Sequence, residues 1–78
     1  MATDVSGRLR FTLWTLHKNG KTVTCLWFTD RRVLQCELQL VSGDETFSHD
    51  CQFRDVSSTQ LWWKEAMLKR GWQPHDAD

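Results

Sequence analysis

The chain has 78 residues, with ten Lys+Arg against ten Asp+Glu, three Cys, five Trp and no Tyr. This length allows one small domain and no second. The formal net charge of zero disfavours a dedicated polyanion binder or a cationic membrane peptide, and the odd number of cysteines excludes a framework in which all of them are paired within the chain.

Residues 1–7 are polar and contain no apolar run, which is not the pattern of a signal peptide. The sequence also has no apolar stretch long enough to span a membrane. We expect residues 1–7 to be flexible, residues 8–72 to form a single domain, and residues 73–78 to form a flexible tail. Unpaired cysteines without an export signal predict a cytoplasmic protein.

Two strands are predicted at residues 8–16 and 21–29, which are rich in β-branched and aromatic side chains. Between them, Asn19-Gly20 is typical of a type I′ hairpin turn, since both residues tolerate a positive φ. A third strand, residues 33–41, alternates apolar and polar side chains. Residues 42–45 predict another turn, and residues 46–54 a fourth strand.

The hydrophobic period then becomes helical, and we expect a helix from about residue 58 to residue 70. Ser57 and Gln60 fit a capping box, Val56 and Leu61 a hydrophobic staple, and Gly71 a left-handed C-cap residue. On this helix Trp62, Trp63, Ala66 and Met67 share one arc, while Leu61 and Leu68 lie nearly opposite, so the side that faces the sheet stays open. The predicted fold is α+β: a four-stranded antiparallel β-meander followed by one C-terminal α-helix packed on one sheet face.

Turn lengths predict which side chains meet, because a slip of one residue inverts a strand. A two-residue loop at Asn19-Gly20 places Leu16 opposite Val23, Trp14 opposite Cys25 and Thr12 opposite Trp27. An even loop at the next turn places Cys25 opposite Cys36. An even loop at Gly43-Asp44 places Cys36 opposite Cys51, Leu38 opposite His49 and Leu40 opposite Phe47, so that all three hairpins share one apolar face. Its central rung is then predicted to contain Trp14, Cys25, Cys36 and Cys51.

On the other sheet face, one helix cannot cover the apolar side chains that the same register predicts for the first two strands. Monomers usually avoid an exposed patch of this kind, and a symmetric homodimer is the commonest way to bury it. We therefore predict a small, non-enzymatic interaction domain that homodimerises through this patch, which comprises Leu9, Phe11, Leu13, Leu26 and Phe28.

The three cysteines and His49 have the ligand types of a Cys₃His zinc site, but the chain lacks the close Cys spacing of a zinc knuckle. Buried thiols explain Cys25, Cys36 and Cys51 better, since free cysteine is among the most buried residue types. The sequence shows no paired carboxylates with a convergent geometry, no phosphate-binding loop and no catalytic motif. We therefore expect no metal, no cofactor and no enzymatic activity.

The alternative function is single-stranded nucleic-acid binding. The predicted order of four strands and a helix over residues 8–72 resembles the unit of Whirly-type single-stranded-DNA-binding domains, which implies a dimer that presents strands to nucleic acid. Such a surface needs aromatic platforms beside a positive track. The candidate basic residues lie at the turns, whereas Glu37 and Asp50 lie on the sheet; they are Lys18, Lys21, Arg31 and Arg32.

Overall fold

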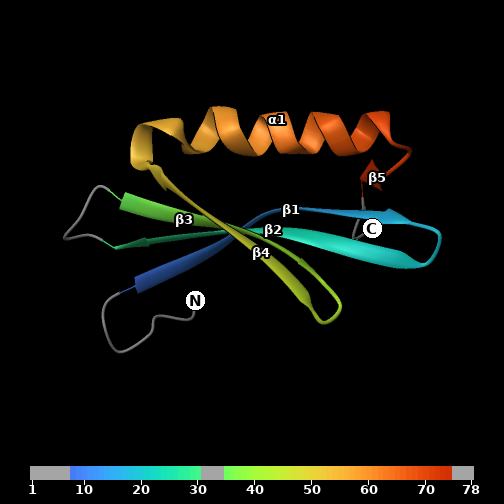
Figure 1. Ribbon diagram of the computed structural model, residues 1–78, viewed down its shortest axis with the longest axis horizontal. Helices are drawn as coiled ribbons and strands as arrows, with labels where there is room; N and C mark the ends of the chain where they lie inside the picture. The colour runs from blue at the N-terminus through green and yellow to red at the C-terminus, as the bar shows by residue number, and fades with distance from the viewer. Residues whose placement is uncertain (1–7, 31–34, 75–78) are drawn as a thin grey trace.

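The computed structural model describes residues 8–30 and 35–74, which form an antiparallel sheet with a helix lying over one face (Figure 1). The strand order is β4-β3-β2-β1-β5. This arrangement confirms the predicted α+β meander followed by one helix. The elements are β1 (Arg8–Lys18), β2 (Lys21–Asp30), β3 (Gln35–Ser42), β4 (Glu45–Gln52), the short 3₁₀ helix η1 (Phe53–Asp55), α1 (Val56–Lys69) and β5 (Gln73–Pro74).

The two-residue strand β5 was not predicted. Gln73 and Pro74 were assigned to a flexible tail, but they pair with His17 and Leu16 at the outer side of β1. The remainder of the predicted tail, residues 75–78, and the predicted flexible segment 1–7 lie outside the described residues.

Both predicted two-residue turns are confirmed by their backbone angles. Asn19 and Gly20 have φ values of 51° and 78°, as a type I′ turn requires. Gly43 has a φ of 59° and is followed by Asp44 without a positive φ, which is the pattern of a type II′ turn. Glycine carries this φ without the steric cost of a Cβ.

The register is confirmed at these two turns. Leu16 pairs with Val23, and Trp14 with Cys25. In the β3–β4 ladder the predicted pairs are also present: Cys36 with Cys51, Leu38 with His49, and Leu40 with Phe47.

Between β2 and β3 the predicted register is wrong. Cys25 lies opposite Leu40 instead of Cys36, and Cys36 lies opposite Thr29. The strands are joined through residues 31–34, which lie outside the described residues, and the sequence there carries no Asn-Gly or Gly signal to fix a loop length. Because the displacement is an even number of residues, the same side chains still face the helix. The actual rung is Trp14, Cys25, Leu40 and Phe47.

A β-bulge interrupts the N-terminal half of β1. The register shifts between Thr12 and Trp14, so that Thr12 pairs with Leu26 and Phe11 with Trp27. The prediction had placed Thr12 opposite Trp27. A bulge inserts one extra residue, here Leu13, and the alternation of faces changes across it.

The core lies between the sheet and α1 and is thin. Its buried side chains are Leu16, Val23, Cys25, Cys36, Leu38 and Val56, and no polar or charged side chain among the described residues is buried. Partly buried neighbours complete it, including Leu13, Trp14, Trp27 and Trp63. A core of this size contributes only modest stability, so its aromatic neighbours matter.

The helix begins earlier than predicted. Val56 is its first residue and is buried, and Asp55 is the N-cap, without a side-chain cap hydrogen bond. The predicted capping box with Ser57 as N-cap is therefore wrong, because η1 leads directly into the helix. Gln60 instead accepts a hydrogen bond from Trp14 Nε1 at 2.9 Å and so ties α1 to β1.

The C-terminal end of the helix is as predicted. Gly71 has a φ of 96°, its N–H donates to the Leu68 carbonyl at 3.1 Å, and the Trp72 N–H donates to the Met67 carbonyl at 3.1 Å. These two bonds define a Schellman motif. The motif turns the chain back toward the sheet, where Gln73 reaches β1.

Candidate interaction surface

The predicted five-residue patch does not form on one face. Because of the bulge, Phe11 pairs with Trp27, and their rings lie 5.3 Å apart on the side that α1 covers. Leu9 pairs with Thr29 on the same side, and Leu13 packs against the core. Among the five, only Leu26 and Phe28 stay on the face away from the helix.

The face away from the helix is largely polar around these two side chains. Leu26 lies between Thr12 and Gln39, and Phe28 lies between Arg10 and Glu37. Both apolar side chains are already half-buried. This face is therefore a poorer apolar interface than the sequence predicts.

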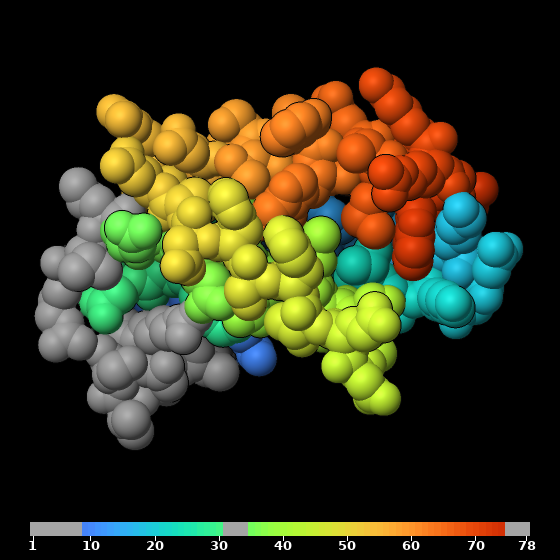
Figure 2. Space-filling model, in the orientation of Figure 1, coloured from blue at the N-terminus to red at the C-terminus, as the bar shows by residue number. Residues whose placement is uncertain are grey.

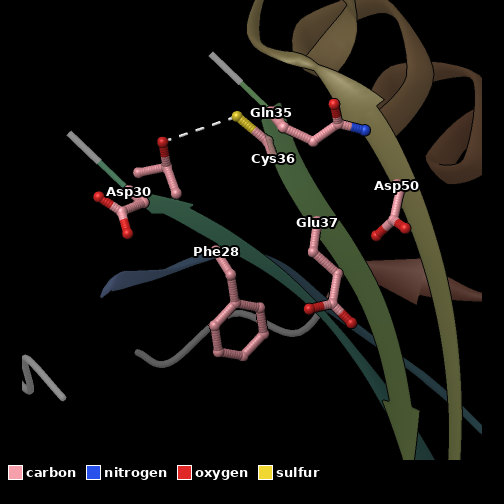
Figure 3. Close-up of a pocket in the computed structure, with 7 residues that line it drawn as sticks. Phe28, Asp30, Gln35, Cys36, Glu37 and Asp50 are labelled. Atoms are coloured by element: carbon pink, nitrogen blue, oxygen red, sulfur yellow. Dashed lines mark hydrogen bonds between the residues drawn. The ribbon is translucent and has the colours of Figure 1, made fainter. Parts of the chain in front are cut away.

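A shallow pocket of about 240 Å³ lies at the end of β2 and β3, and Figure 3 shows its lining. Glu37 and Asp50 are directly opposite each other in the β3–β4 ladder, and their carboxylates point to the same side as the Phe28 ring. Gln39 Nε2 donates to Glu37 Oε2 at 3.0 Å. Around Phe28, these two carboxylates outnumber the neighbouring cation of the described residues, Arg10, and this balance disfavours a polyanion there.

Large exposed hydrophobic side chains lie instead on the helix and on the side of the sheet that it covers. Trp62 is the most exposed, at 74%. Monomeric proteins normally hide a tryptophan, since its ring is the largest apolar group available for packing. The set comprises Phe11 (38% exposed), Phe47 (56%), Phe53 (53%), Leu61 (48%), Trp62 and Leu68 (37%).

Side-chain contacts show which strand lies beneath each side of the helix. Trp63 meets β4, with its ring 5.8 Å from Phe47 and 5.7 Å from His49. Gln60 meets β1 through Trp14. With 3.6 residues per turn, Trp62 therefore leans toward the β4 side of α1, whereas Leu61 lies toward the β1 side.

We call the ring-bearing side chains on this side of the molecule the β4 surface: the exposed Phe47, His49 and Trp62, and the half-buried Trp63. In Figure 2 the yellow-green and yellow atoms of β4 lie on the near face, directly below the orange atoms of α1. Sequence reasoning missed this surface. The available signal was the helix itself, which is apolar on more sides than one sheet can cover.

A second group of aromatic rings joins β1, β2 and η1. Trp27 contacts Phe11 and also Phe53 of η1, at 5.5 Å. The Trp27 Nε1 atom is buried and has no hydrogen-bond partner among the described residues. This cluster packs η1 against β2 and, through Trp27, against β1.

The three thiols lie in or beside the core. None of the three cysteines is joined in a disulfide; Cys25 and Cys36 are buried and Cys51 is half-buried. Burial raises the pKa of the Cys25 thiol from 9.0 to about 11. Burial also raises the pKa of Cys51, and the neighbouring Cys36, Asp55 and Asp50 add to the effect. A raised thiol pKa disfavours the nucleophilic thiolate at neutral pH.

No group of three or more potential metal-binding side chains comes together in residues 8–30 and 35–74. Cys36 and Cys51 do lie side by side, and Cys36 Sγ donates to Thr29 Oγ1 at 3.6 Å. His49 is engaged with the Trp63 ring. The cysteines and His49 therefore do not converge on one point.

The described part of the chain shows no continuous positive track formed by the predicted basic residues. Lys18 Nζ donates to the Arg70 carbonyl at 2.5 Å, at the C-terminal end of α1. Lys21 follows the first hairpin turn and is exposed. Arg31 and Arg32 lie outside the described residues.

Comparisons of the chain with protein-family models, with curated proteins and with solved structures give no match. No helix in the described part of the chain has both the length and the apolar character needed to cross a bilayer.

Proposed function

We propose that this chain is a small, non-enzymatic interaction domain that acts by associating with a second copy of itself. The observation that carries the proposal is the exposure of two large rings, Trp62 of α1 at 74% and Phe47 of β4 at 56%. Burying such rings in an interface gains free energy that a monomer forgoes, and buried tryptophans are frequent hot spots of interfaces. Self-association also supplements a thin core.

The thiols support a non-catalytic role in a reducing compartment such as the cytoplasm. Cys25 and Cys36 are buried in the apolar core, and Cys51 is half-buried beside them. Raised pKa values at Cys25 and Cys51 keep these groups protonated at neutral pH. They then act as small apolar side chains, which a reducing environment preserves.

Sedimentation equilibrium of the wild-type chain tests self-association. We expect the mean mass to rise from monomer toward dimer as the concentration increases from low to high micromolar. A mass that stays monomeric at high micromolar concentration would refute the proposal. Circular dichroism at each concentration checks that the chain stays folded.

Binding of single-stranded nucleic acid is the competing outcome. In a titration with a labelled oligonucleotide at low salt, the proposal predicts no saturable binding. Saturable binding that weakens as salt increases, and weakens further in the double variant Arg31→Glu/Arg32→Glu, would replace the proposal. The opposed carboxylates of Glu37 and Asp50 favour the first outcome.

A further inference from the structure

We infer that the second copy docks along β4, antiparallel to its counterpart, with the two-fold axis at Ser48. The two sheets then join into one, and both helices lie on the same face, because a two-fold axis perpendicular to the sheet preserves its faces. This inference rests on the proposed self-association and names its surface: the outer edge of β4 with the β4 surface above it.

The strand β4 is an open edge. Within the described residues it pairs only with β3, through an uninterrupted register from Ser42–Glu45 to Gln35–Gln52. The strand contains no proline and no lysine, which are the residues that commonly protect an edge. Its eight residues span about 27 Å, the length of a typical pairing strand.

The turn between β3 and β4 determines which backbone groups of β4 point away from β3. Ser42 and Glu45 flank the two-residue turn, and such flanking residues are hydrogen-bonded to each other. Bonding then alternates along an antiparallel ladder, so Thr46, Ser48 and Asp50 direct their N–H and C=O groups away from β3. These groups are available to a second strand.

A second copy fits this edge because the edge is self-complementary. With the axis at Ser48, Thr46 lies opposite the second copy's Asp50 and Phe47 lies opposite its His49. This pairing gives about six backbone hydrogen bonds and two aromatic cross-strand pairs. An axis at Asp50 would instead oppose two carboxylates. The zero net charge of the chain adds no overall repulsion between copies.

The apolar area lies beside the seam. Phe47 is on the helix side of β4, where its ring contacts Trp63. Helix geometry places Trp62 on the β4 side of α1, so in the proposed dimer Phe47 and Trp62 of each copy border the junction. At their exposures of 56% and 74%, the two rings offer on the order of 300 Å² per copy. Together with the strand edge, this area corresponds to an interface at the smaller end of the specific range, about 1,200 Å² in total.

A cysteine at the axis tests the geometry. In the proposed dimer the two Ser48 Cα atoms lie about 5.5 Å apart, within disulfide range, whereas the two Thr46 Cα atoms lie about 14 Å apart. We expect mild oxidation of Ser48→Cys to give a covalent dimer on a non-reducing gel. Thr46→Cys is the matched control on the same strand and face, and it should give no more covalent dimer than the wild type.

Equal cross-linking of Ser48→Cys and Thr46→Cys would indicate random collisions and would overturn the inference. Absence of cross-linking at Ser48→Cys in a chain that sediments as a dimer would also overturn it, while leaving the proposed self-association intact. A wild type that sediments as a monomer would instead refute the proposed function itself.

A second pair of variants tests the aromatic border. Trp62→Glu should weaken dimerisation at least about tenfold, because it removes the most exposed ring and adds a charge beside the seam. Leu61→Glu, on the β1 side of the same helix, should change the dissociation constant by less than about threefold. The same circular dichroism spectrum for both variants checks folding. Equal weakening in the two variants would contradict the assignment of the surface.

Discussion

The two edges of the sheet differ in whether another part of the chain covers their outer side. The β1 edge is bulged at Leu13 and is covered at its C-terminal half by β5, through Leu16 and His17. Lys18 also holds the end of α1 through the Arg70 carbonyl. The β4 strand pairs with β3 in an uninterrupted register without a bulge, and within the described residues no strand lies on its outer side.

This difference shows how a small chain covers the unpaired backbone N–H and C=O groups at one edge of its sheet and leaves those at the other edge exposed. An exposed, regular edge is a template for pairing with another strand, and bulges and short covering strands block such pairing. The Schellman motif at Gly71 returns the chain to β1, so the segment after the helix closes that edge. The edge left open is the one bordered by Phe47 and Trp62.

The largest expected effect comes from removing the bulge. Deletion of Leu13 should remove the bulge and leave Phe11 opposite Trp27, because Thr12 and Trp14 then become neighbours opposite Leu26 and Cys25. We expect a loss of at least about 3 kcal/mol in the free energy of unfolding, measured by urea denaturation, since the core loses a leucine and β1 loses the local bend that the bulge provides.

The variant Leu13→Ala separates the two causes. It removes the side chain but keeps the extra residue, and it should cost about 2 kcal/mol. If the deletion costs no more than this substitution, the bulge itself adds nothing to stability, and the contrast between the two edges weakens.

The features that the sequence predicted are those set by short-range geometry. Asn19-Gly20, Gly43 and Gly71 each need a positive φ, and each is recognisable without knowledge of distant residues. They determined two of the three registers and the end of the helix. The meander followed from the connections between adjacent elements.

The features that escaped prediction depend on contacts between distant residues. The bulge places Phe11 against Trp27, which also contacts Phe53 of η1. No pattern within β1 reports that packing. Likewise, the exposure of Trp62 depends on which side of α1 faces the sheet, and this is decided by Val56 and Trp63 packing in the core.

An intermediate effect concerns pH and the cysteine in the middle of the sheet. Burial raises the pKa of Cys25 from 9.0 to about 11, so the folded chain keeps this proton to a higher pH than the unfolded chain does. Unfolding in this range releases a proton, and the free energy of unfolding therefore falls as the pH rises from about 9 to about 11, by about 2–3 kcal/mol. Below pH 9 this contribution is fully present.

Urea denaturation across this pH range measures the loss, with Cys25→Ala as the control. The variant should be less stable at neutral pH but should lose less stability between pH 9 and pH 11, since lysines titrate in both proteins. An equal dependence of unfolding free energy on pH in the two proteins would contradict a buried, protonated Cys25.

Cys51 lies on the open-edge strand β4 and is only half-buried, so it should react with iodoacetamide before Cys25 does.

The smallest effect distinguishes two indole groups. Trp14 Nε1 donates to Gln60 and ties the covered side of the sheet to α1, whereas Trp27 Nε1 is buried without a partner. Trp14→Phe removes ring area and a hydrogen bond; Trp27→Phe removes similar ring area and an unsatisfied donor. We expect Trp14→Phe to cost about 1 kcal/mol more in the free energy of unfolding.

A double-mutant cycle isolates the hydrogen bond from the change in ring size. Trp14→Phe and Gln60→Ala, measured singly and together by urea denaturation, should show a coupling of about 0.5–1.5 kcal/mol, because each single change already breaks the bond. The pair Trp27→Phe and Gln60→Ala should be additive. A coupling near zero between Trp14 and Gln60 would mean that α1 is held over β1 by apolar packing alone. In that case the Schellman motif and β5 would cover the β1 edge without a contribution from the hydrogen bond between α1 and β1.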